Sequence, residues 1–338
     1  MNAATKILII LADDLGWGNI GIDTPHILQL MQESLVFRNA HAPVSWCAPT
    51  RWAIMQGRYP YTKTPAIVAP VTAPLMSATA PTLAKHMRTA GYKTGIFGKW
   101  HLGGNPLDYG FQRAFWYRDA HNLPAMMDDR DPINPTIDKV LPRIVGQAVK
   151  FMGDYDRWFV YAALPTPHRP ILGTYSEWVG ACDNAVRDLV AAAGPDAMVI
   201  VTSDNGTEER AGIDHDVPNP NRGWKQSLYD GGTRVPFCVR HPNLEPGETD
   251  QLVSLHDIPA TLGALVGFVA HADSTDIFGV PRSHLITQDK AGRYAVRNSG
   301  GWKLHVASGL LYHMPTDPKE ATPRDEPEIA EGLAALAP

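Results

Sequence analysis

Pairs of oxygen-bearing side chains occur twice in the sequence, each time close after a run of apolar residues. The first pair is Asp13 and Asp14, and the second is Asp204 and Asn205. Carboxylates gathered in one cleft repel one another unless protons or a cation neutralise them. Ligand sets made only of oxygen favour Ca²⁺, or less well Mg²⁺, over zinc, which prefers His and Cys. Each pair alone is also a common turn sequence, but two pairs after two apolar runs favour a metal site.

Cys47 is followed by Pro49 and Arg51, and this arrangement suggests a helix start. Pro49 suits the first turn of a helix that would end near Gly57. Cys47 would then lie at the helix N-terminus, where free backbone N–H groups and the helix dipole favour an anion. The alternative is a buried packing thiol, which is the commonest fate of a free cysteine.

The other two cysteines, Cys182 and Cys238, are predicted to be buried thiols. The three cysteines are odd in number and include no C-x-x-C pair. Neither a disulfide framework nor a zinc knuckle fits this pattern.

Two lysines and two histidines are further candidates for a site. Lys99 and His101 follow the apolar run 94–98, His168 follows the run 158–164, and Lys225 lies in a Gly-Trp-Lys sequence. Lysines are by default solvated surface charges, and most histidines have purely structural roles. These four residues gain interest only if the fold brings them to the acidic pairs.

The elements that must position these residues form a repeating pattern. Apolar runs without alternation, such as 6–12 and 197–202, suit strands buried on both faces of a parallel sheet. Helical stretches are expected between them, at 81–90, 177–193 and 252–266. This order predicts an α/β fold with a large, mostly parallel or mixed sheet sandwiched by helices. Because ligands in such folds bind beyond the carboxyl ends of the strands, the polar clusters should converge on one site.

The last fifty residues have a different character. Short strand-like runs at 293–296, 302–307 and 310–313 predict a small antiparallel sheet. A closing helix is expected at 329–336. We therefore expect a catalytic α/β domain over residues 1–288 and a small C-terminal subdomain over residues 289–338.

Composition narrows the class of protein. The 338 residues include 30 Lys and Arg against 35 Asp and Glu, a net charge of −5 that argues against nucleic acid as a partner. No uncharged apolar run approaches the roughly 20 residues of a membrane-spanning helix, so no membrane partner is expected. The first apolar run is also too short for a signal peptide, and this predicts a cytoplasmic protein.

Several motifs, taken in order along the chain, resemble those of the type I sulfatases, which depend on formylglycine and belong to the alkaline-phosphatase-like superfamily. The match covers almost the whole chain. The motifs are Asp13-Asp14, Cys47-x-Pro49-x-Arg51, Gly98 to Gly103, Pro167-His168, Ser203 to Gly206, Gly223 to Lys225, Tyr229 to Pro236 and Gly301 to Leu304. One departure is Thr50, which stands where the sulfatase signature usually has serine.

The resemblance implies a chemistry for the cysteine. A formylglycine-generating enzyme would oxidise Cys47 to formylglycine, whose hydrated aldehyde attacks sulfur to give a covalent sulfated intermediate. The second hydroxyl then expels sulfate and regenerates the aldehyde. The expected substrate is a small aryl or sugar sulfate.

The resemblance also implies roles for the remaining candidates. Ca²⁺ would be held by Asp13, Asp14, Asp204 and Asn205. Arg51, assisted by His101, would hold the modified side chain, Lys99 and Lys225 would neutralise the sulfate, and His168 would protonate the leaving oxygen. These are roles that developing charge demands: cations around an anionic centre and an acid at the leaving oxygen.

Two other functions stay open. A phosphonate monoester or phosphodiester hydrolase of the same superfamily would use the same nucleophile, but Asn205 stands where such hydrolases commonly carry His, which favours sulfate. An unconverted, catalytically silent homologue would bind Ca²⁺ and sulfated sugars without turnover. The chain is short for the family, so we expect its substrate-selecting elements either to be reduced or to be supplied by a second subunit, for example in a homo-oligomer.

Overall fold

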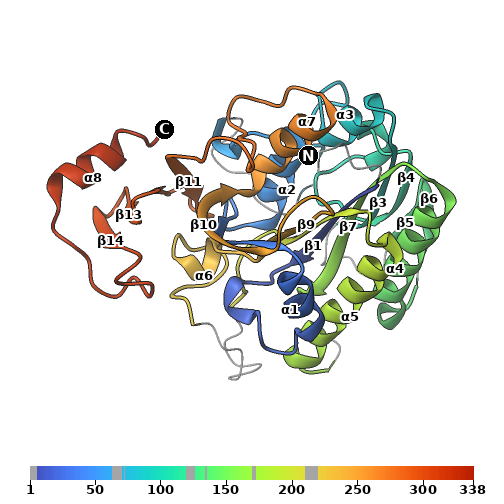
Figure 1. The fold of residues 1–338 in the computed structure, drawn as a ribbon, viewed down its shortest axis with the longest axis horizontal. Helices are drawn as coiled ribbons and strands as arrows, with labels where there is room; N and C mark the ends of the chain where they lie inside the picture. Colours follow the sequence, from blue (N-terminus) through green and yellow to red (C-terminus); the bar gives the residue numbers. More distant parts are fainter. Residues whose placement is uncertain are drawn as a thin grey trace.

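The computed structural model describes residues 6–62, 71, 73–118, 126–133, 135–169, 173–209 and 220–338. The chain forms a larger body built on a ten-stranded sheet and a smaller C-terminal lobe built on a four-stranded sheet (Figure 1). The strands of the larger sheet are β1 (Lys6–Asp13), β2 (Leu35–His41), β3 (Lys93–Lys99), β4 (Arg113–Tyr117), β5 (Met126–Asp128), β6 (Asp131–Ile133), β7 (Trp158–Pro167), β8 (Met198–Ser203), β9 (Phe237–Arg240) and β10 (Gly247–Ser254).

The order of these strands is β10-β2-β9-β8-β1-β7-β3-β4-β5-β6. The five central strands, from β8 to β4, all run parallel, whereas β9, β5 and β6 pair antiparallel with their neighbours. Ile9 of β1 lies opposite Tyr161 of β7 on one side and Ile200 of β8 on the other. The apolar runs are therefore buried on both faces, which confirms the predicted mixed, mostly parallel sheet.

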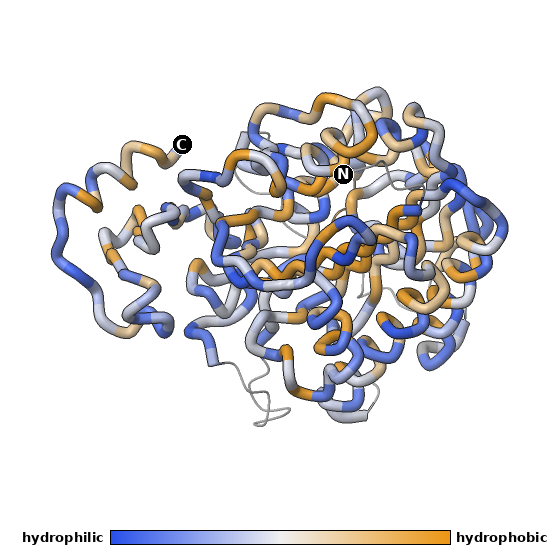
Figure 2. Tube along the Cα trace, in the orientation of Figure 1, coloured by the Kyte–Doolittle hydropathy of each residue, from blue (hydrophilic) through white to orange (hydrophobic). Residues whose placement is uncertain are grey.

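Helices cover both faces of this sheet (Figure 1). The core on one face includes residues of α2, α3 and α7, and the core on the other includes residues of α1, α4 and α5. Hydrophobic residues are concentrated in the strands between these two layers (Figure 2). The helices are α1 (Pro25–Gln32), α2 (Cys47–Gln56), α3 (Leu83–Thr89), α4 (Ile137–Asp154), α5 (Tyr175–Ala193), α6 (Asp230–Thr233), α7 (Ile258–Val266) and α8 (Pro327–Ala334), with 3₁₀ turns at Trp17–Asn19, Pro60–Thr62, Pro106–Tyr109 and Leu255–Asp257.

The helix predicted over 252–266 is wrong in its first third. Leu252 to Ser254 end strand β10, and the helix proper begins at Ile258. The backbone N–H of Ser254 donates to the Asp257 carboxylate, forming a capping box that stops the strand and starts the turn. The continuous apolar composition of this stretch suits a buried strand as well as a buried helix, so periodicity did not separate them.

The C-terminal lobe contains the antiparallel strands β11 (His284–Gln288), β12 (Tyr294–Asn298), β13 (Trp302–His305) and β14 (Leu310–His313). Helix α8 closes its small core, to which Leu333 contributes. Strand β11 was not predicted, and the expected division after residue 288 runs between β11 and β12. That division into two domains stays a prediction.

A buried cluster of charges joins the lobe to the larger body. Asp230, in α6 of the body, is ion-paired with Arg297 of β12 and with Lys303 of β13, whose Nζ lies 2.9 Å from Asp230 Oδ1. Lys303 Nζ also lies 2.8 Å from Glu320 Oε1, and Glu320 accepts a hydrogen bond from the Asp230 backbone N–H. The contact between body and lobe is therefore polar and fully desolvated at its centre. Among the helices of the described ranges, none has the length and apolarity to span a membrane.

Candidate active site

The four central strands β8, β1, β7 and β3 bring the polar clusters to one edge of the larger sheet. Asp13 is the last residue of β1, Lys99 is the last of β3, and His168 follows β7 directly. Asp204 follows β8, and its backbone N–H donates to the carbonyl of Ala12 in β1 at 3.2 Å. Because parallel strands end at the same edge, the convergence predicted from sequence occurs.

Two glycines allow this close approach of the chain. A side chain at Gly98 would place its Cβ 1.8 Å from the carbonyl oxygen of Ala163 in β7, and the φ of Gly98 is 112°. A Cβ at Gly206 would lie 1.9 Å from the carbonyl oxygen of Gly231. Only glycine fits either position, which gives the Gly98-Lys99 and Asn205-Gly206 sequences a physical reason.

The two acidic pairs form one buried cluster. Asp14 adopts a left-handed backbone conformation with φ of 70°, and its N–H donates to Asp204 Oδ1 at 3.3 Å. Asn205 Nδ2 donates to Asp14 Oδ1 at 2.7 Å. Asp13, Asp14, Asp204 and Asn205 are each no more than 1% exposed. This burial makes the cluster costly unless cations compensate the carboxylates.

The donor set fits a hard divalent cation. Asp13 Oδ1 and Asn205 Oδ1 are buried and accept no hydrogen bond from any described residue. Carboxylate oxygens of Asp13 and Asp14 lie within 4.8 Å of one another and of a His168 ring nitrogen. Unsatisfied oxygens this deeply buried need a partner, and carboxylate and amide oxygens are ligands that Ca²⁺ prefers.

Three cationic side chains neutralise the three carboxylates. Lys99 Nζ lies 2.6 Å from Asp13 Oδ2, Lys225 Nζ lies 2.6 Å from Asp14 Oδ1, and Arg51 Nη2 lies 2.7 Å from Asp204 Oδ2. All three cations are at least nine-tenths buried. A divalent cation added to this balanced set would leave the pocket with a net charge of +2, which favours an anionic ligand.

The charges shift the pKa values of the acids in opposite directions. Burial raises the pKa of Asp14, but the ammonium of Lys225, with His168 and Lys99, outweighs it and holds that pKa well below its usual range. Burial and the neighbouring Asp13 carboxylate raise the pKa of Asp204 to about 6, against the opposing charge of Arg51. Bound metal adds positive charge and favours the ionised form of both.

Cys47 is the first residue of α2, as the sequence predicted, and the helix ends at Gly57 with φ of 64°. The Cys47 side chain is buried, and burial raises its pKa although Lys99 and Lys225 oppose this. Its sulfur lies within 4.8 Å of carboxylate oxygens of Asp13 and Asp204. An unmodified Cys47 is therefore held as a thiol, which is a poor nucleophile.

Two neighbours on α2 fix the position of Cys47. Arg51, one turn on, donates from Nε to Asp204 at 2.8 Å and from Nη1 to the Lys99 carbonyl at 2.9 Å. Thr50, which replaces the usual serine, is fully buried and donates through Oγ1 to the Val44 carbonyl at 2.8 Å. The hydroxyl common to serine and threonine thus ties the helix start to the preceding segment, and the extra methyl is accommodated.

The two histidines face this cluster in the neutral state. Burial, with the charges of Lys99 and Arg51, holds the pKa of His101 far below its ordinary value, and neither of its ring nitrogens has a hydrogen-bond partner in the described ranges. Burial lowers the pKa of His168 to about 3, although Asp14 opposes this. His168 Nδ1 donates to the Arg169 carbonyl at 2.6 Å, and Nε2 lies 3.8 Å from Asp14 Oδ2. An incoming anion would raise both pKa values.

All ten residues predicted from sequence therefore lie in one buried cluster. Two tyrosines near Arg51, Tyr117 and Tyr161, have buried hydroxyls with no hydrogen-bond partner among the described residues. Sequence reasoning considered Tyr117 only as a possible lining of an apolar pocket and did not single out Tyr161. Both lie within apolar strands, where nothing in the pattern marks a polar function. It also missed Trp46, which precedes Cys47.

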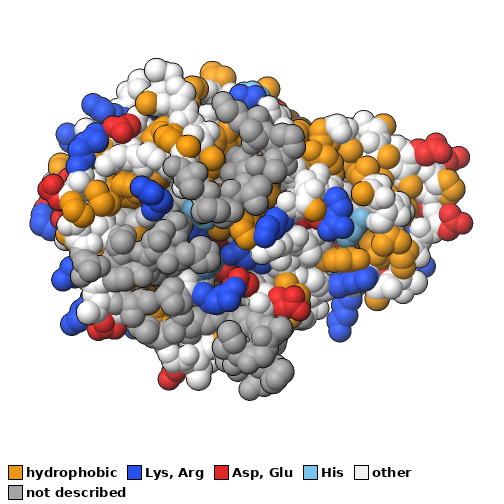
Figure 3. Space-filling view, turned by 180° about the vertical axis from the view of Figure 1, so that it is seen from behind, with side chains coloured by type: hydrophobic (Ala, Val, Ile, Leu, Met, Phe, Trp, Pro, Cys, Tyr) orange, Lys and Arg blue, Asp and Glu red, His pale blue; other side chains and the backbone are white. Residues whose placement is uncertain are grey.

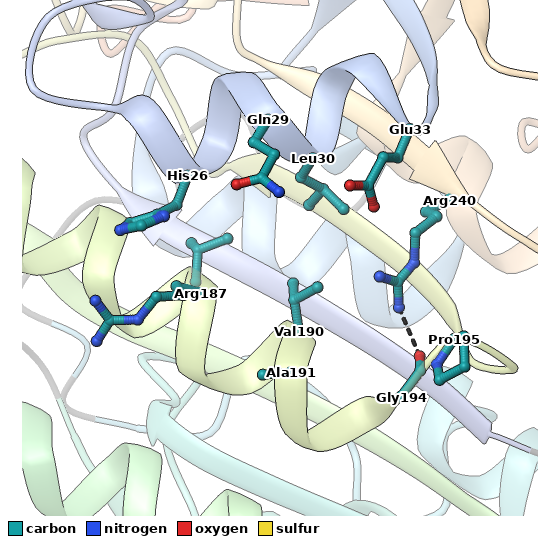
Figure 4. A pocket seen from close by; sticks show the side chains of 11 residues that line it. His26, Gln29, Leu30, Glu33, Arg187, Val190, Ala191, Gly194, Pro195 and Arg240 are labelled. Carbon is teal, nitrogen blue, oxygen red and sulfur yellow. Dashed lines mark hydrogen bonds between the residues drawn. The ribbon is translucent and has the colours of Figure 1, made fainter.

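Basic side chains gather on one face of the molecule (Figure 3). Figure 3 shows Lys and Arg side chains gathered across the middle of one face of the molecule, despite the net charge of −5. A cavity of about 340 Å³ between α1 and α5 (Figure 4) is lined by His26, Glu33, Arg187 and Arg240 among others, and none of the ten site residues lines it.

Known proteins are similar to this chain in sequence. The sequence model of the Sulfatase family matches residues 5–268. Arylsulfatase A of Homo sapiens is 29% identical over 388 aligned residues, which cover 92% of this chain and 76% of that protein. N-acetylgalactosamine-6-O-sulfatase of Bacteroides thetaiotaomicron is 26% identical, over 98% of this chain and 92% of that protein.

Solved structures agree with the fold. A structure from work on glycosaminoglycan metabolism by Bacteroides thetaiotaomicron superposes with a TM-score of 0.87 at 22% identity and covers 98% of both chains. A sulfatase from Pseudoalteromonas sp. gives a TM-score of 0.83 at 19% identity, over 98% of this chain and 88% of that one. Since the family model matches more than three-quarters of the sequence, this chain belongs to the sulfatase family and is a sulfuric ester hydrolase.

Proposed function

We propose that the protein hydrolyses the sulfate monoester of an aryl alcohol or a sugar, using a formylglycine derived from Cys47 and a bound Ca²⁺. The observation that carries the proposal is the juxtaposition at Cys47. Its sulfur lies within 4.8 Å of carboxylate oxygens of Asp13 and Asp204, and these belong to the cluster with unsatisfied buried oxygens. A nucleophile beside a cation-binding set and three buried cationic side chains fits attack on an anionic ester.

The proposed mechanism needs two groups that the twenty standard amino acids do not supply, a bound Ca²⁺ and the formylglycine aldehyde. Asp13, Asp14, Asp204 and Asn205 would hold the Ca²⁺, which would polarise the sulfate oxygens as a Lewis acid. The hydrated aldehyde would supply one hydroxyl that forms a bond to sulfur and a second whose collapse to the carbonyl releases sulfate.

The side chains of this chain perform the remaining tasks. Arg51, fixed by Asp204 and the Lys99 carbonyl, would hold the modified residue 47 in register with the metal ligands. His101, whose ring nitrogens have no partner in the described ranges, would accept a hydrogen bond from that residue. Lys99 and Lys225 would turn from the carboxylates toward the sulfate oxygens as the metal takes over the carboxylates.

His168 is the proposed acid for the leaving oxygen. Its Nδ1 proton is committed to the Arg169 carbonyl, so the proton that it transfers must be on Nε2, the nitrogen that faces Asp14. The anionic ester raises the pKa of the ring toward the range where it can carry that proton. The alkoxide or phenoxide then leaves as the neutral alcohol.

The test combines mass spectrometry with turnover. Protein coexpressed with a formylglycine-generating enzyme should show the aldehyde at residue 47 and release sulfate from an aryl sulfate. Cys47→Ala should abolish release while leaving the melting temperature close to that of the wild type. Full turnover by Cys47→Ala would refute the mechanism, and aldehyde-bearing protein that cleaves phosphonate but not sulfate esters would favour the phosphonate hydrolase.

A further inference from the structure

Trp46, the residue before Cys47, has the ammonium groups of two lysines close to its ring. Lys225 Nζ lies 5.3 Å from the centroid of its ring, and Lys290 Nζ lies 4.7 Å from the same centroid. The two ammonium groups are therefore no more than about 10 Å apart. The Trp46 Nε1–H has no acceptor among the described residues.

Lys290 is presented by a rigid hairpin turn between β11 and β12. The Asp289 carboxylate in this turn accepts hydrogen bonds from the N–H groups of Ala291 and Arg293, both at 2.9 Å, and pairs with the Arg293 guanidinium. The Asp289 carboxylate is thus occupied by partners within the turn and does not neutralise the charge of Lys290. Lys290 is exposed, and within the described ranges it forms no ion pair or hydrogen bond.

The turn is also fixed relative to the nucleophile. Gln288 N donates to the Pro43 carbonyl at 2.9 Å, and Ser45 N donates to the Gln288 carbonyl at 2.9 Å. Gln226 N donates to the Ser45 carbonyl at 2.8 Å. The segment that leads into Cys47 therefore lies between β11 and the loop that carries Lys225, and all three parts form one unit.

We propose that Trp46 and Lys290 form a substrate subsite beside the sulfate pocket. Trp46 holds the Lys290 ammonium in place, and that ammonium binds a second anionic group of the substrate saccharide, a sulfate or a carboxylate. Lys225 belongs to the pocket for the scissile sulfate, whereas Lys290, held over an aromatic face with no acidic partner, is a preformed site for another negative charge. The inference rests on the proposed function, because it specifies the substrate of that same site as a polyanionic saccharide.

The subsite can be tested by binding, without turnover. In a Cys47→Ala background saturated with Ca²⁺, calorimetry compares N-acetylgalactosamine 6-sulfate with N-acetylgalactosamine 4,6-disulfate. Adding Lys290→Gln should weaken binding of the disulfate by roughly three- to tenfold and that of the monosulfate by less than about twofold, as expected for one partly exposed charge pair. Lys290→Glu should weaken disulfate binding further.

Lys150→Gln is the matched control. Lys150 is exposed and lies near the end of α4 that leads into the start of β7, at the opposite edge of the sheet from the site. An equal loss for both sugars, or no loss for either, in Lys290→Gln would overturn the subsite. Failure of the proposed function would appear elsewhere, as absence of sulfate release by protein that carries the aldehyde, while the binding ratio still reports on Lys290.

Discussion

A substitution at Asp230 tests whether the buried charge cluster holds the C-terminal lobe to the larger body. The substitution Asp230→Asn keeps the size of the side chain and removes its charge. Asp230 is 2% exposed and pairs with both Arg297 and Lys303, so the variant leaves two buried cations facing a neutral amide. Burial raises the pKa of Asp230, but Arg297 and Lys303 outweigh it and hold that pKa well below its usual range, which indicates that the folded state favours the carboxylate.

The expected loss of stability depends on the hydrogen-bond partners that Arg297 and Lys303 keep in the variant. Breaking a buried ion pair typically costs 3–5 kcal/mol. Arg297 Nη1 keeps a 2.9 Å hydrogen bond to Asn39 Oδ1, and Lys303 keeps Glu320 at 2.8 Å. Because neither cation is left wholly without an acceptor, the loss should lie at the lower end, about 3 kcal/mol, with a fall in melting temperature on the order of 5 °C.

Denaturant unfolding followed by tryptophan fluorescence and circular dichroism measures this loss. Glu248→Gln is the control, because it breaks an ion pair with Arg38 in which the Glu248 side chain is 61% exposed, and it should change stability by less than about 0.5 kcal/mol. A loss for Asp230→Asn no larger than that of the control would refute the reasoning. Stability that Asp230 provides should fade in acid as pH falls through the carboxyl range, since protonation removes the charge that the folded state favours.

Two further predictions concern metal and pH. Ca²⁺ at a hundred times its dissociation constant should stabilise the wild type by about 2.7 kcal/mol and so raise its melting temperature. In a thermal scan, Asp204→Asn should remove most of that rise. An equal rise in the variant would exclude Asp204 as a ligand. Burial lowers the pKa of His256 from its ordinary 6.5 to about 4. Between these values the unfolded chain binds a proton that the folded protein does not, so His256 makes stability fall as pH falls from 6.5 toward 4, by up to about 3 kcal/mol. Denaturant midpoints measured across that window should therefore change more steeply in the wild type than in His256→Gln, and parallel curves would contradict the assignment.

Local signals in the sequence were enough for the central elements and for the identity of the site residues. Uninterrupted apolar runs marked β1, β3, β7 and β8, because strands buried on both faces have no polar side to show. Pro49 and Gly57 marked the two ends of α2, since each has a backbone preference that a helix end requires. Asp13, Asp204 and Lys99 were placed at one edge of the sheet by the rule that parallel strands end together.

Which of these groups pair with which was decided only by the tertiary structure. Lys99 pairs with Asp13, which is 86 residues away in the sequence, and Lys225 pairs with Asp14, which is 211 residues away. Strand β11 was not predicted either, because it forms through pairing with β12 and through contacts with the segment before Cys47. The position of Lys290 over Trp46 follows from those same contacts. Sequence determined the chemistry available to this protein through local preferences, and the fold determined its arrangement, because packing between distant segments sets the distances on which charge pairing depends.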